Sequence, residues 1–177
     1  SDQWWQIVHM QGDFNKSRRN VVLSHFLKVA DETMSAFRPQ TRKNGNLPHL
    51  SFIHRKPEDL GTELKTLACT ITRIMLYMEL QRSKSDPLGR EFQEVVNRVT
   101  SACCMRMVND SWQRFRTDDT SAEEIFVGDS WFGSIPTAVS LKKKMTDGKK
   151  SGSICNIKTE HARYPKAYLK RTMKAWL

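Results

Sequence analysis

Asp129 is the side chain in this sequence best placed to do metal-ion chemistry. It comes after the apolar residues 125–127 and Gly128, a pattern that predicts a short buried strand. A carboxylate at the carboxyl end of a sheet strand can reach a ligand or a metal ion. The spacing also permits a plainer role, in which Asp129 only stabilises the turn after the strand.

Other residue types that carry chemistry lack the spacing of a site. The cysteines form no CxxC pair, and no histidine lies at zinc-finger spacing from them. We therefore expect buried, reduced thiols, as in an intracellular protein. These cysteines are Cys69, Cys103, Cys104 and Cys155. Asp118 and Asp119 form a carboxylate pair, but the Thr and Ser residues around them favour a helix cap or a turn.

Three stretches resemble motifs of the piggyBac-type transposases, in the same order along the chain. Residues 129–136, Asp-Ser-Trp-Phe-Gly-Ser-Ile-Pro, resemble the segment around the second catalytic aspartate of that family. Residues 31–38 are similar to its Asp-Glu entry motif, and residues 55–65 to its Lys-Pro approach to the first catalytic strand. Coincidence is a poor explanation for three ordered matches.

The resemblance implies an α/β fold, a ribonuclease-H-like mixed sheet with flanking helices that is incomplete at the C-terminus. It also implies one partial transposase-derived domain over residues 1–177. Within it, residues 1–60 would supply N-terminal helices and a basic loop, and residues 61–177 a truncated core. Such transposases use several carboxylates to hold two divalent metal ions, which activate the attacking oxygen and stabilise the leaving oxygen. Asp129 matches the catalytic aspartate and is the candidate metal ligand.

The first carboxylate of the family pattern falls on Cys69, or on Thr70 if the alignment shifts by one position. A neutral thiol is a poor ligand for Mg²⁺, and a single hydroxyl brings no charge. The family's remaining aspartates lie beyond the matched segment, and this chain ends at Leu177. We therefore expect Asp129 to be vestigial, the chain not to cleave DNA, and no cofactor to be bound. Mg²⁺ or Mn²⁺ would serve if the chain were active.

The net charge of +10 predicts a polyanionic partner, with DNA expected first. A basic loop and a basic helix end suit contact with the phosphate backbone. The candidate residues are Arg38, Arg42, Lys43, Arg55, Lys56, Lys142, Lys143 and Lys144. A dispersed charge on a basic protein is the alternative. No apolar run approaches the ~20 residues that span a membrane. The family resemblance implies nuclear localisation.

Two other functions are open at this point. One is an active metal-dependent transposase or nuclease that is truncated in this chain. The other is a protein-interaction module on the same fold, since the five tryptophans suit a core or a contact surface. A homodimer or another protein partner is compatible with either.

The elements that position these residues follow from hydrophobic periodicity. We expect a first helix that ends near Gly12, and a strand over residues 26–30 that ends at Asp31 and Glu32, both in turn or cap roles. A hairpin over 61–80 and a helix over 90–108 with Arg106 in solvent follow. Ser134 or Ser130 would cap the helix after Asp129. A last strand over 153–158 and a terminal helix from Tyr164 complete the series.

Overall fold

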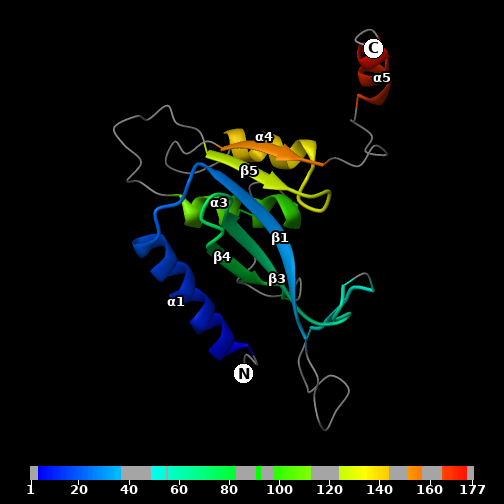
Figure 1. Cartoon of the computed structure of the whole chain (residues 1–177). Helices are drawn as coiled ribbons and strands as arrows, with labels where there is room; N and C mark the ends of the chain where they lie inside the picture. Colours follow the sequence, from blue (N-terminus) through cyan, green and yellow to red (C-terminus); the bar gives the residue numbers. More distant parts are fainter. Residues whose placement is uncertain are drawn as a thin grey trace.

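The computed structural model describes residues 4–36, 49–54, 56–82, 91–92, 98–112, 124–143, 151–156 and 165–174. Four helices and six strands are assigned in these ranges (Figure 1). In chain order they are α1 (Trp5–Val21), β1 (Leu27–Ala36), β2 (Ser51–Phe52), β3 (Leu60–Cys69), β4 (Met75–Leu80), α3 (Val99–Ser111), β5 (Glu124–Gly128), α4 (Ile135–Lys143), β6 (Ser151–Cys155) and α5 (Lys166–Lys174).

The six strands form one mixed sheet in the order β2-β3-β1-β5-β6, with β4 also paired to β3. β1 runs antiparallel to β3 and parallel to β5, and β5 runs parallel to β6. The central strand therefore comes from the part of the chain before Gly61. The predicted α/β class, a mixed sheet flanked by helices, is confirmed.

The core lies between the sheet and the helices α3 and α4; Figure 1 shows α3 behind β1 and α4 next to β6. Side chains of β1 alternate between buried and exposed, as the pleat requires. Ala30 faces the core opposite Leu67 of β3, and Phe126 of β5 packs there as well. α3 contributes a nearly continuous buried run over residues 101–108.

α1 covers the outer edge of β4 through side-chain amides. Asn15 Nδ2 donates to the carbonyl of Met78 at 2.9 Å, and the N–H of Met78 donates to Asn15 Oδ1 at 2.9 Å. The N–H of Leu80 donates to Gln11 Oε1 at 2.8 Å. Gln11 and Asn15 are four residues apart on α1, and they bind Leu80 and Met78, which are two residues apart on β4. This protects an edge that would otherwise offer unpaired backbone groups.

Several predicted boundaries and orientations are wrong. α1 continues through Gly12 because docking on β4 outweighs the weak helix propensity of one glycine. Asp31 and Glu32 lie in the middle of β1, not at its end. Arg106 is buried, because Glu79 on β4 binds its guanidinium at 2.6 Å.

Two expected elements are shifted along the chain. Within the described residues α3 begins at Val99, after an extended Arg98, while residues 93–97 of the predicted helix lie outside the described ranges. The last strand is found at Ser151–Cys155, slightly earlier than expected.

Candidate functional site

Asp129 opens a tight turn at the carboxyl end of β5, and residues 128–134 are called the Asp129 turn below. Asp129 Oδ1 accepts the backbone N–H of Trp131 at 2.8 Å, and its carbonyl accepts the N–H of Gly133 at 2.9 Å. A Cβ at Gly128 would lie 2.8 Å from Cβ of Phe132, and one at Gly133 only 2.0 Å from a backbone oxygen of Asn156. The turn therefore needs glycine at both positions.

The turn leads directly into α4. Ser134 Oγ accepts the N–H of Thr137 at 3.1 Å, so the predicted Ser134 cap is confirmed. The hydroxyl of Thr137 also lies 2.9 Å from that of Ser101 on α3. These contacts connect the turn to α4 and, through Thr137, connect α4 to α3.

Asp31 is the carboxylate that the strand register brings next to Asp129. Ala30 pairs with Gly128 in the parallel β1–β5 ladder, and each aspartate is the next residue in its chain. Parallel strands lie about 4.8 Å apart. Asp31 is exposed, and its Oδ1 accepts the N–H of Glu32 at 2.8 Å. Sequence reasoning gave Asp31 no chemical role, although it follows an apolar run just as Asp129 does.

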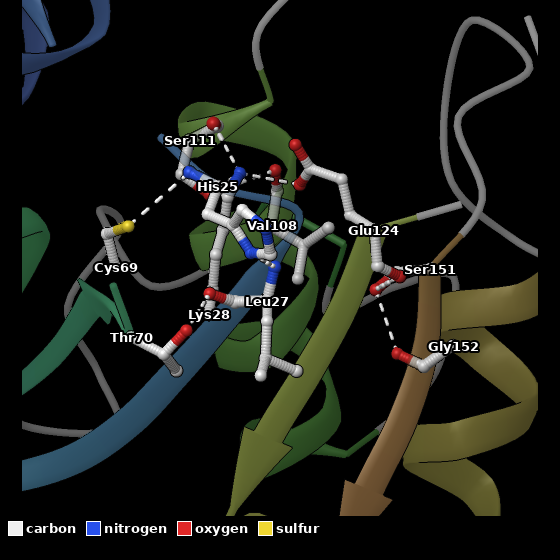
Figure 2. Close-up of polar contacts among 10 residues, drawn as sticks. All are labelled: His25, Leu27, Lys28, Cys69, Thr70, Val108, Ser111, Glu124, Ser151 and Gly152. Atoms are coloured by element: carbon white, nitrogen blue, oxygen red, sulfur yellow. Dashed lines mark hydrogen bonds and ion pairs between the residues drawn. The ribbon is translucent and has the colours of Figure 1, made fainter. Parts of the chain in front are cut away.

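Cys69 lies away from Asp129. It is the residue on which the first carboxylate of the family pattern falls. It pairs with Lys28, whose parallel partner is Phe126, three residues before Asp129. Figure 2 shows the Sγ of Cys69 near His25, whose backbone N–H donates to it at 3.4 Å. Thr70 Oγ1 donates to the carbonyl of Leu27 at 2.9 Å. The structure therefore does not bring Cys69 or Thr70 to the Asp129 turn.

Hydrogen bonds dominate the electrostatics of Cys69. Burial raises the pKa of the thiol, but donors from Thr72, His25 and Ile71 outweigh it and lower the pKa to about 7. The other described thiols behave in the opposite way. Burial raises the pKa of Cys103, Cys104 and Cys155.

A buried ion pair holds the other end of β5 (Figure 2). Lys28 Nζ lies 2.6 Å from Glu124 Oε2 and donates to the carbonyl of Ser111 at 2.7 Å. Ser111 is the last residue of α3, so the ammonium satisfies a carbonyl at the end of that helix. Ser151 Oγ on β6 donates to the carbonyl of Glu124 at 2.9 Å. β5 is thus anchored at its start as well as at the Asp129 turn.

A second buried lysine touches the Asp129 turn itself. Lys65 Nζ lies 3.3 Å from the centroid of the Trp131 ring. The same ammonium is 3.6 Å from Glu32 Oε1 and donates to Glu63 Oε1. Sequence reasoning missed Lys65, because nothing in its neighbours along the chain marks a buried cation.

The predicted basic residues are only partly within the described ranges. Lys56 Nζ donates to the carbonyl of Glu32 at 2.8 Å, which places it near the Asp129 end of β1. Lys142 and Lys143 are exposed at the end of α4, the opposite end of that helix from the turn. The others lie outside the described residues: Arg38, Arg42, Lys43, Arg55 and Lys144.

The described residues do not fit a divalent metal centre. No group of three or more His, Cys, Asp or Glu side chains that could hold a metal ion occurs among them. One oxygen of Asp129 is bound by its own turn, and Glu32 is paired with Lys65. Mg²⁺ needs several oxygen ligands in near-octahedral geometry.

The mixed sheet with its flanking helices has the fold of a transposase catalytic domain. Residues 7–173 match the family model described as Transposase IS4, so the chain belongs to that family.

Among solved structures, the chain is similar to a piggyBac transposase, in the cryo-EM structure of its synaptic complex with hairpin DNA. The identity is 16%, the TM-score is 0.63, and the match covers 94% of this chain. At that identity the likeness shows the fold. The chain spans 30% of the transposase chain that it matches. Comparison with curated protein sequences found no match.

Proposed function

We propose that this chain is a transposase-derived domain that binds DNA and does not cut it. The observation that carries the proposal is the Asp129 turn: the family resemblance implies a catalytic aspartate at this position, and one oxygen of its carboxylate is engaged in the turn. The strong positive charge of the chain supports retention of the nucleic-acid partner.

The lack of cleavage follows from charge. A two-metal mechanism needs several carboxylates, because two divalent ions held close together repel each other strongly. Within the described ranges no such set of ligands is assembled. Cys69 stands opposite Lys28, too far along the sheet to complete one.

The test of this proposal is strand cleavage and strand transfer on terminal-repeat DNA with Mg²⁺ or Mn²⁺. We expect no product above the background of a protein-free reaction. Cleavage that disappears in the variant Asp129→Ala would overturn the proposal. Asp59→Ala, at an exposed residue, is the matched control for loss of one acid.

DNA binding by this domain would depend on counterion release and not on base contacts. Exposed cations such as Lys142 and Lys143 are free to approach phosphates. None of the helices in the described ranges is long and apolar enough to cross a membrane. The positive charge of the chain makes DNA the proposed partner, and the family resemblance makes the nucleus the expected compartment.

The neighbouring carboxylates favour one second candidate, an active metal-dependent transposase or nuclease of which this chain is a part. Asp31 and Asp129 follow the paired residues Ala30 and Gly128, so two acids share one end of the sheet. This candidate predicts that Asp31→Asn and Asp129→Asn each abolish metal-dependent cleavage by a longer protein containing this domain. Retained cleavage in one variant would exclude that aspartate from the metal site, and no cleavage by the unmodified longer protein would exclude the candidate.

A further inference from the structure

Lys65 places a positive charge inside the molecule, against the Asp129 turn. Its side chain is 1% exposed, and its ammonium lies 3.3 Å from the centroid of the Trp131 ring. The ring of Phe132 is within 5.6 Å of the same ammonium. Because the N–H of Trp131 donates to Asp129, the ammonium contacts the residue that closes the turn. A cation over an aromatic face is most stabilising when it is desolvated, as here.

Two carboxylates on the neighbouring strand positions balance this charge. Glu32 faces Lys65 across the β1–β3 ladder, with its Oε1 3.6 Å from the ammonium. Glu63, two residues before Lys65 on β3, accepts a hydrogen bond from it. Glu32 is also buried, with its side chain 4% exposed, so removal of the ammonium would leave negative charge inside the protein.

We propose that the ammonium of Lys65 does at this end of the sheet what a bound cation would do. It neutralises Glu32 and Glu63 and, through Trp131, fixes the Asp129 turn without a divalent metal ion. Lys65 is thus a positioning residue. This role of Lys65 is independent of DNA binding and cleavage, because the state of the turn is measured directly.

Amide hydrogen exchange on the full chain, without DNA, tests the proposal. In Lys65→Met, which is unbranched like lysine but one atom shorter and uncharged, we expect the Trp131 amide to lose about tenfold in protection relative to Phe126 in β5. Lys65→Arg retains the charge and should restore most of that protection. Lys143→Met, at an exposed lysine, is the control and should leave the Trp131 amide unchanged.

Lys65→Met leaves two carboxylates without their cation and can fail to fold. The double variant Glu32→Gln with Lys65→Met lowers that charge imbalance and keeps the measurement available. Loss of Trp131 protection in the folded double variant supports the proposal, and unchanged protection overturns it. Addition of Mg²⁺ to the unmodified protein should not alter the exchange of the turn. A tenfold gain in protection on adding Mg²⁺ would also overturn the proposal.

Discussion

At the scale of single residues, the molecule depends on cations buried where a strand pattern predicts apolar side chains. Lys28 and Lys65 both lie on the covered face of the sheet, and each is bound by carboxylates. Burying such a charge is unfavourable unless it is paired and hydrogen-bonded. These pairs therefore make the positions around them sensitive to substitution.

The variant Glu124→Gln should lower the free energy of unfolding by about 3–5 kcal/mol, because it leaves Lys28 charged and buried without its carboxylate. Urea unfolding followed by circular dichroism measures the change. Replacing both partners, as in Lys28→Met with Glu124→Leu, should recover most of the loss. A single variant as stable as the unmodified protein would show that the pair carries little of the stability.

Cys69 predicts a pH dependence whose sign is fixed by its lowered pKa. In the folded chain the pKa is about 7, against an ordinary value of 9.0, so the thiolate is favoured by folding. The stabilisation is present above pH 9 and is lost as the pH falls through 7. The difference in unfolding free energy between the protein and Cys69→Ala should thus grow between pH 6.5 and pH 9, on the order of 2 kcal/mol.

Cys104→Ala is the comparison for that measurement. Burial raises the pKa of Cys104, so its thiol stays neutral in the folded chain over the same range. The effect of Cys104→Ala should not grow between these pH values. Equal pH profiles for the two variants would contradict the assignment of a hydrogen-bonded thiolate to Cys69.

At the scale of elements, α1 acts as a substitute strand along the free edge of β4. Asn15 exchanges two hydrogen bonds with Met78 in the way that a paired strand residue would. Gln11 adds a third bond at Leu80. An uncovered strand edge invites pairing with another chain.

Asn15→Leu should cost about 1–3 kcal/mol of stability, because it leaves the N–H and the carbonyl of Met78 without their partner. It should also promote self-association, which light scattering detects. Ser17→Leu adds the same side chain on the exposed side of α1 and is the matched control. Equal scattering from both variants would assign the effect to surface hydrophobicity and not to the edge.

At the scale of the whole molecule, the net charge of +10 is the property that most affects binding to a polyanion. Charge of this kind acts through the counterions of a nucleic acid, so it predicts affinity that falls with salt. It says little about sequence preference, which needs contacts with base edges.

Lys142→Gln combined with Lys143→Gln should reduce the slope of log affinity against log salt by about 2, if each lysine contacts a phosphate. Fluorescence anisotropy with a labelled duplex at several salt concentrations gives the slope. The paired substitution of both lysines by arginine keeps the charge and should leave it unchanged. An affinity that does not depend on salt would argue against the proposed DNA binding altogether.

The sequence by itself determined the local unit around Asp129. The apolar residues 125–127, Gly128 and the Ser134 cap act within a few positions of one another, and the structure places them as expected. Such signals depend on short-range hydrogen bonds and on backbone freedom, which a single stretch of sequence carries.

Only the tertiary structure decided which residues from other parts of the chain lie near the Asp129 turn. Strand register places Asp31 at the same end of the sheet as Asp129, Lys65 reaches Trp131 from another strand, and Cys69 falls at a different level of the sheet. Arg106 is buried because Glu79, 27 residues away, binds it. Register and buried ion pairs depend on how distant segments close on one another, and that information is spread over the whole chain.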